Sequence, residues 1–312
     1  MVYLIVSIAL LALGIKGYCG KKTSGFMRNI GDSFLMNTIR FLLCILVGLV
    51  FVLIETESLK IDGGMLAICV FSGITMALNV GFWALAVKYC AMSTLDVMTT
   101  LSSIIPAVLC SIFFGETFSW MKMIGFTLIV IASFFMMGYN RSIKGKGSIL
   151  GKILMLLTVL GDAFFSFSQQ IYKQFRTVGG MYADGKPTYS KTVFNFYIYI
   201  FAAITLSLFF IIYALTTKDK KEVSLNALSK NTYPALPFIA IMAICLFIAN
   251  FMQTAATNDF NMPSQILYPI IKAGCLIMNT LTAAIFFGEK PNKKSYIGLS
   301  FALIGIVLIN IL

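Results

Sequence analysis

Histidine is absent from this 312-residue sequence, and only 12% of its residues are charged. Without histidine, the chain lacks the commonest metal ligand and the commonest general base, so a histidine-paired serine or cysteine nucleophile is excluded. Soluble domains carry roughly 25% charged and about 45–50% apolar residues, whereas 59% of this chain is apolar. Both departures point toward a protein that is solvated by lipid.

Other motifs are also missing. Residues 14–23 read GIKGYCGKKT and superficially resemble a phosphate-binding loop. However, five residues instead of four separate Gly14 from Gly20, and no serine or threonine follows Lys21 directly. The closest acids, Glu55 and Glu57, lie in a loop, so no cluster of acids suits a metal-dependent transferase. We therefore expect no ATP-driven pump, no metal site, no cofactor and no enzyme.

Cysteine is present, but its number and spacing do not suggest pairs. The seven cysteines are odd in number, contain no CxxC pair, and lie in or at the ends of apolar runs. Cysteine in such positions behaves as a small apolar side chain. The sequence therefore indicates packing roles for all of them.

What the sequence has in abundance is long apolar runs. Each run has about 18–25 mostly apolar residues, enough for a helix to cross a hydrocarbon core of about 30 Å. In lipid the backbone must satisfy its own hydrogen bonds, which favours helices. The sequence predicts an all-α, multi-pass protein of the cell membrane, with the lipid bilayer as a partner and ten spans, at residues 2–19, 34–54, 64–87, 97–115, 119–139, 149–171, 193–216, 235–256, 263–287 and 295–312.

The net charge of +12 does not indicate nucleic-acid binding, because the basic residues gather at the ends of the spans. Sixteen of the 24 lysines and arginines, Lys16 among them, follow odd-numbered spans, and Arg40 and Lys272 lie inside spans. Cytoplasmic loops attract lysine and arginine. We therefore expect the odd loops inside and both termini outside, because only six basic residues follow even-numbered spans: Lys60, Lys122, Lys173, Arg176, Lys186 and Lys191.

An internal repeat is the most specific feature of the sequence. Phe-Phe-Gly-Glu ends the fourth span at residues 113–116 and the ninth span at 286–289, and at the same offset of 173 residues Gly125 corresponds to Gly298. A repeat unit of five helices must cross the membrane in opposite directions in its two copies. The sequence therefore predicts two inverted five-helix repeats, residues 1–145 and 146–312, with a substrate site near mid-membrane between them.

The chain resembles the drug/metabolite transporter superfamily, in particular its ten-helix EamA-type members. The resemblance is carried by Arg40-Phe41, by the two Phe-Phe-Gly-Glu helix ends, and by Gly125 and Gly298. It implies two inverted sets of five helices, a central cavity, and export or exchange of metabolites, amino acids or drugs. Members of this family are often drawn with both termini in the cytoplasm, which is opposite to the orientation that the basic residues predict.

Polar residues inside the spans predict the substrate site, because they are costly in lipid and usually face a cavity or a partner. Asp162 and Lys272 are the only charged residues that we place near the middle of a span, and they form either a fixed ion pair or part of a wet cavity. Polar and aromatic residues on other spans are expected to complete the site, unless they only bind neighbouring helices. The predicted substrate-binding residues are Asp162, Lys272, Asn79, Trp83, Asn250, Gln253, Tyr268 and Gln169.

These features favour a secondary transporter that moves a small organic metabolite or drug by alternating access. An amino-acid-like zwitterion suits Asp162 and Lys272 best, and a proton is available as a coupling ion through Asp162. The alternatives are a channel or a membrane-embedded substrate sensor and, less favoured, a membrane enzyme. Both a monomer and a homodimer are compatible with the sequence.

Overall fold

The computed structural model describes residues 1–89, 95, 98–100, 102–116, 120–137, 149–177, 190–217, 225–287 and 293–310. Within these ranges the chain forms ten helices and no strand, as expected of an all-α protein. The helices are α1 (Val2–Ser24), α2 (Ile30–Ile54), α3 (Gly63–Tyr89), α5 (Ile104–Phe114), α6 (Trp120–Met137), α7 (Ile149–Thr177), α8 (Lys191–Thr216), α9 (Leu225–Asn258), α10 (Ser264–Phe287) and α11 (Lys293–Asn310).

Seven helices are long and apolar enough to cross a membrane, namely α1, α2, α3, α7, α8, α9 and α10. In the other three regions the described apolar stretches are shorter, at Met98–Phe114, Met123–Ala132 and Tyr296–Gly305. Each of the ten predicted spans overlaps a helix, and the multi-pass arrangement is therefore confirmed at this level.

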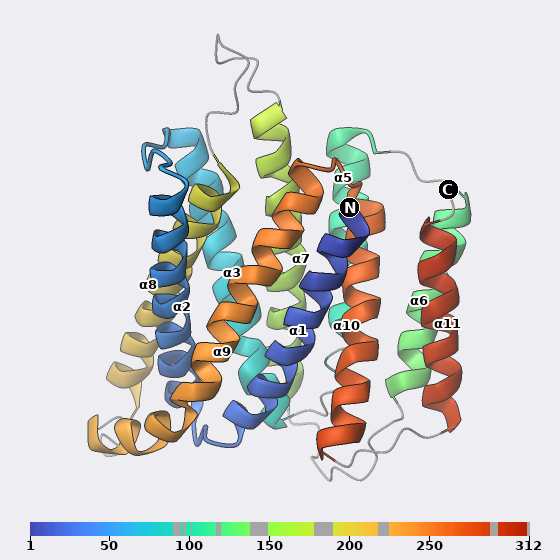
Figure 1. Cartoon of the computed structure of the whole chain (residues 1–312). Coiled ribbons are helices and arrows are strands. Elements are labelled where there is room, and N and C mark those ends of the chain that lie inside the picture. Colours follow the sequence, from blue (N-terminus) through green and yellow to red (C-terminus); the bar gives the residue numbers. More distant parts are fainter. Residues whose placement is uncertain are drawn as a thin grey trace.

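Two helix boundaries differ from the sequence prediction in ways that matter. The first span was expected to end at residue 19, but α1 continues to Ser24, which moves Lys16 from the end of the span to its interior. The eighth span was expected to begin at residue 235, but α9 begins at Leu225 and contains Pro234 and Pro237. Proline removes a helical hydrogen bond and bends a helix, and α9 changes direction near its start (Figure 1).

The helices pack in pairs that join residues far apart in the sequence. The pairs α3–α7, α1–α9 and α2–α8 make extensive contacts, and α3 also packs on α8 as α2 does on α9. The helices α6 and α11 pack on each other at one side of the bundle (Figure 1). This edge position agrees with the scarcity of polar residues in the fifth and tenth predicted spans.

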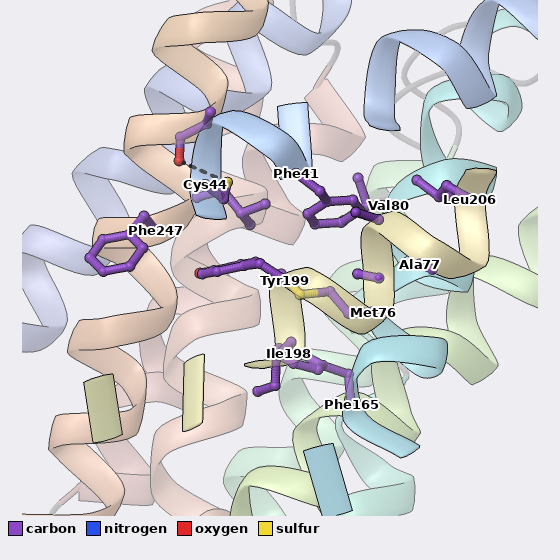
Figure 2. Packing of buried hydrophobic residues seen from close by; sticks show 14 of the residues in the cluster. Phe41, Cys44, Met76, Ala77, Val80, Phe165, Ile198, Tyr199, Leu206 and Phe247 are labelled. Carbon is purple, nitrogen blue, oxygen red and sulfur yellow. Dashed lines mark hydrogen bonds between the residues drawn. The ribbon is translucent and has the colours of Figure 1, made fainter. Parts of the chain in front are cut away.

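One apolar core holds α2, α3, α8 and α9 together. Phe41 and Tyr199 stack with their ring centroids 6.2 Å apart, and Tyr199 also contacts Phe247 at 5.9 Å. The Cys44 thiol points at the Ala243 carbonyl oxygen, 3.4 Å away (Figure 2). Cysteine in this core acts as a small packing residue, in line with the sequence prediction. Among the described cysteines, those that are buried are Cys19, Cys44, Cys69, Cys110 and Cys245, and Cys90 lies outside the described residues.

A glycine sets the separation of α3 and α7. A Cβ atom at Gly161 would lie 2.5 Å from the Asn79 backbone nitrogen and 2.8 Å from the Thr75 carbonyl oxygen. Small residues let membrane helices approach closely in this way. The contact matters for the site because Gly161 directly precedes Asp162, and α3 carries Asn79.

Candidate functional site

A cavity of about 100 Å³ lies between α1, α2, α3, α7, α9 and α10. A single water needs roughly 10–15 Å³ by the same kind of measure, so the cavity has room for several waters. Six of the eight residues that the sequence predicted for the substrate site line it: Asn79, Trp83, Asp162, Asn250, Gln253 and Lys272.

Asp162 is the centre of a polar network in this cavity. Its Oδ1 accepts a hydrogen bond from Lys272 Nζ at 2.5 Å and another from Asn79 Nδ2 at 2.8 Å. Its Oδ2 accepts a hydrogen bond from the Ser102 hydroxyl. The side chains of Asp162 and Lys272 are 7% and 16% exposed, so the ion pair is shielded but still borders the cavity.

Tyr268 and Gln169 lie outside the cavity. Tyr268 is fully buried, donates a hydrogen bond from its hydroxyl to the Ser166 carbonyl oxygen at 2.6 Å, and accepts one from Gln170. The Gln169 amide is buried, and neither its oxygen nor its nitrogen has a hydrogen-bond partner. Tyr268 therefore holds α10 against α7 behind the cavity, whereas no contact explains the Gln169 amide.

Asn250 and Gln253 approach the cavity from α9. Asn250 donates to the Tyr199 hydroxyl oxygen at 3.1 Å, which ties the cavity wall to the aromatic core. Gln253 lines the cavity and is 9% exposed. The Trp83 ring, from α3, lies where a Cβ atom at Gly20 would be only 2.8 Å from it, so the glycine leaves room for the indole.

The structure brings two further cations to the cavity. Lys16 and Arg40 both line it, so Asp162 and Lys272 are not the only deep charges, contrary to the sequence interpretation. Lys16 was counted with the loop because it lies near the predicted end of the first span, and Arg40 was placed inside the second span but was not assigned to the site. Arg40 is in fact 2% exposed. The sequence could have indicated it as a site residue, because it is an arginine inside an apolar run. The correction leaves fifteen basic residues after odd spans against six after even ones.

Ser102 and Asn279 are further site residues that sequence reasoning did not select. Ser102 lies just before α5 and binds Asp162. Asn279 lines the cavity, and its Oδ1 would be 2.3 Å from a Cβ atom at Gly17. Both residues lie on polar faces or in polar runs of the sequence, but only their packing distinguishes them from other serines and asparagines.

The residues that line the cavity come from both sides of the middle of the bundle. We define the odd-loop end as the end where α1, α3, α8 and α10 finish, and the even-loop end as the end where α2, α5, α7 and α9 finish. Lys16 and Gly17 lie in the second half of α1, Asn79 and Trp83 in the second half of α3, and Arg40 in the first half of α2. Asn250 and Gln253 lie in the second half of α9, and Lys272 lies in the first half of α10, which is toward the even-loop end. The cavity therefore extends to both sides of mid-bundle.

Polar contacts hold the even-loop end together. The Thr192 hydroxyl donates to Glu55 Oε2 at 2.6 Å, which joins α8 to the end of α2. Lys191 forms an ion pair with Asp259. The chain termini lie at this same end, as Figure 1 shows. The contacts thus join the start of α8 to the residues that follow α2 and α9.

Glu116 of the first Phe-Phe-Gly-Glu segment adds a third contact at the even-loop end. Its carboxylate accepts hydrogen bonds from the Ser264 hydroxyl, at 2.5 Å, and from the Ser264 backbone N–H, at 3.5 Å. The first N–H groups of a helix have no partner within it, so Glu116 caps α10. The end of α5 therefore lies beside the start of α10. Glu289 of the second segment lies outside the described residues, as do Asp96 and the side chain of Lys88.

No group of three or more cysteine, aspartate or glutamate side chains within the described ranges is arranged to hold a metal ion. The polar groups of the cavity are amides, hydroxyls, cations and one carboxylate. Such a set can bind and orient a polar organic molecule by hydrogen bonds and charge.

Comparisons with known proteins agree with this arrangement. Residues 1–138 match the EamA-like transporter family. A solved structure described only as "Crystal structure of protein" is similar over 99% of this chain and 96% of its own, with a TM-score of 0.69 and 14% sequence identity. At that identity the likeness concerns the fold alone. No curated protein matches the chain.

EamA-like proteins are membrane transporters of small molecules and not enzymes. The match to their family over residues 1–138 and the shared fold over the whole chain support assignment of this multi-pass protein to the drug/metabolite transporter superfamily.

Proposed function

We propose that this protein is a secondary transporter that moves a small organic metabolite across the cell membrane by alternating access. The observation that carries the proposal is the cavity, which is lined by polar and charged side chains from α1, α2 and α3 together with those from α7, α9 and α10. A substrate in it would contact residues from both 1–145 and 146–312.

An inverted repeat of those two segments is part of the proposal. Exchanging α1 with α7, α2 with α8, α3 with α9 and α5 with α10 converts each main contact into another that is also present. The contact α1–α9 becomes α7–α3, α2–α9 becomes α8–α3, and α1–α10 becomes α7–α5, while α2–α8 and α6–α11 map onto themselves. The contact of Glu116 with Ser264 supports opposite directions for α5 and α10.

This symmetry supplies a mechanism. Each repeat can adopt the conformation of the other, and the exchange moves the opening of the central cavity to the opposite side. The polar contacts at the even-loop end support a conformation closed on that side. In the proposed cycle they separate, and equivalent contacts form at the odd-loop end.

The Asp162–Lys272 pair is the proposed contact point for substrate. A charge at mid-membrane without a partner costs about 2.5–3.5 kcal/mol or more, so neither side chain leaves the other unless something replaces it. The ammonium and carboxylate of an amino-acid-like zwitterion would replace both partners, and a proton on Asp162 would release Lys272. Asn79, Trp83, Asn250 and Gln253 are proposed to orient the substrate.

A flux assay with purified protein in sealed vesicles tests the proposal. A carrier gives saturable uptake of labelled substrate and counterflow when unlabelled substrate is present inside. Linear, non-saturating conductance would instead indicate a channel, and binding without any flux would indicate a sensor.

A further inference from the structure

The charges that line the cavity do not balance. Of the described residues around it, Lys16, Arg40 and Lys272 are cationic, and Asp162 is the one acid. Lys16 lies close enough to Arg40, Lys272 and Asp162 for their charges to act on it. By formal charge the cluster therefore has two positive charges in excess.

The single acid is already fully engaged. Asp162 accepts hydrogen bonds from Lys272, Asn79 and Ser102. Its two oxygens thus bind one cation and two neutral donors, and its charge is offset by Lys272. The excess charge is consequently located at Lys16 and Arg40.

Arg40 is buried without the partners that a guanidinium needs. It is 2% exposed, and of its three nitrogens only Nη1 makes a hydrogen bond, a long one of 3.4 Å to Asn37 Oδ1. Its Nε and Nη2 have no hydrogen-bond partner among the described residues. Lys16 makes no hydrogen bond or ion pair to a described residue. Buried charges are normally paired, because an unpaired one is strongly destabilising.

The chemistry of the missing partner follows from these groups. The guanidinium presents a planar fork of donors that matches the two oxygens of a carboxylate or phosphate. Lysine adds a compact cation that binds such groups as a point charge. Neutral or cationic molecules offer these side chains nothing that offsets their charge.

We infer that Lys16 and Arg40 form an acid-binding subsite, and that the transported molecule is an organic anion whose carboxylate or phosphate binds there. The inference rests on the proposed function in that it takes the cavity as the substrate site. It narrows the substrate class: a plain zwitterion satisfies Asp162 and Lys272 but leaves Lys16 and Arg40 unpaired. Dicarboxylates, acidic amino acids and organophosphates satisfy them.

Ligand-dependent thermal unfolding of the purified protein tests the inference independently of transport. The probes are succinate, glutamate, glycerol 3-phosphate and inorganic phosphate, with leucine and choline as controls. We expect at least one anion to stabilise the wild-type protein and neither control to do so. Carboxylate and phosphate probes separate the two possible acidic groups.

Arg40→Gln and Lys16→Gln are the informative variants, and Lys60→Gln, an exposed loop lysine, is the matched control. A hydrogen bond to a charged group contributes enough that its loss should weaken anion binding by about 10- to 100-fold, whereas Lys60→Gln should leave it unchanged. Without ligand, Arg40→Gln should unfold at a temperature equal to or higher than wild type, because it removes an unpaired buried charge.

Several outcomes would overturn the inference. These are stabilisation by leucine or choline with no anion effect, anion binding that survives in both variants, and no anion binding at millimolar concentration. If Arg40→Gln does not fold, Lys16→Gln alone decides. Failure of vesicle flux with intact, variant-sensitive anion binding would contradict the transporter proposal only, whereas flux of a neutral substrate unaffected by either variant would contradict only the anion subsite.

Discussion

At the scale of single residues, the cavity combines an engaged carboxylate with cations that differ in how well they are paired. Asp162 has three donors, Lys272 has one strong acceptor, and Arg40 has one long hydrogen bond. The Asp162–Lys272 pair therefore has two possible roles. It is either a fixed link between α7 and α10 or a pair that opens during transport.

A double-mutant cycle on Asp162→Asn and Lys272→Met separates these roles. Removing one member of a buried pair is expected to cost about 3–5 kcal/mol, because the other charge remains. If the pair is only a link, each single variant should unfold, and the double variant should recover both folding and flux. If the pair binds substrate, the single variants should fold but lose flux, and the double variant should stay inactive. Thermal unfolding and vesicle flux measure the two properties separately.

At the scale of helices, the site depends on how closely α3 and α7 approach. Asn79 reaches Asp162 at 2.8 Å across this contact, and the contact itself depends on the absence of a side chain at Gly161. The same dependence recurs where α1 meets Asn279 at Gly17. The position of the polar network is thus set by glycines that themselves carry no chemistry.

Gly161→Ala tests this dependence. The added methyl group would contact backbone atoms of α3 at 2.5 and 2.8 Å, so the helices must separate, at a cost of about 1–3 kcal/mol. We expect a lower unfolding temperature and reduced flux. Gly63→Ala is the matched control in α3, because nothing lies within 4 Å of its added Cβ atom. Equal behaviour of the two variants would contradict the role assigned to Gly161.

The cap on α10 is a second helix-scale feature that can be tested. Because Glu116 accepts hydrogen bonds from Ser264, Glu116→Ala should lose about 1 kcal/mol of local stabilisation, as removal of a helix cap does. Amide hydrogen exchange in the first turn of α10 should accelerate, and Glu57→Ala, at an exposed loop position, should leave it unchanged. Unaltered exchange in Glu116→Ala would show that the carboxylate does not hold the helix start.

Periodicity and composition predicted the helices well because a span must bury its backbone in lipid, whatever its neighbours. The Asp162–Lys272 pairing was also predictable, since two deep opposite charges are expected to meet. The structure places Tyr268 and Gln169 outside the cavity lining, because a polar face on a helix does not tell which neighbour it meets. Lys16 was missed because a predicted helix end is uncertain by several residues. The first helix ends five residues later than predicted, so Lys16 lies inside the helix and lines the cavity.

At the scale of the whole molecule, helices from residues 1–145 and from residues 146–312 together surround the cavity. Helices α6 and α11, which are poor in polar side chains, pack on each other away from it. The contacts at the even-loop end involve segments far apart in the chain, such as Glu55 with Thr192. In the proposed transport cycle, these contacts would separate when the even-loop end opens.

Orientation in the membrane is the last whole-molecule property that the chain predicts. Both termini lie at the even-loop end (Figure 1), and fifteen basic residues follow odd spans against six after even ones. Because lysine and arginine are retained on the cytoplasmic side, we expect the odd-loop end inside. In intact cells, a membrane-impermeant maleimide should label Lys60→Cys, in an even loop, and fail to label Lys146→Cys, in an odd one, whereas both should react after permeabilisation. The wild-type protein gives the background from its natural cysteines. The reverse pattern would mean that the termini face the cytoplasm.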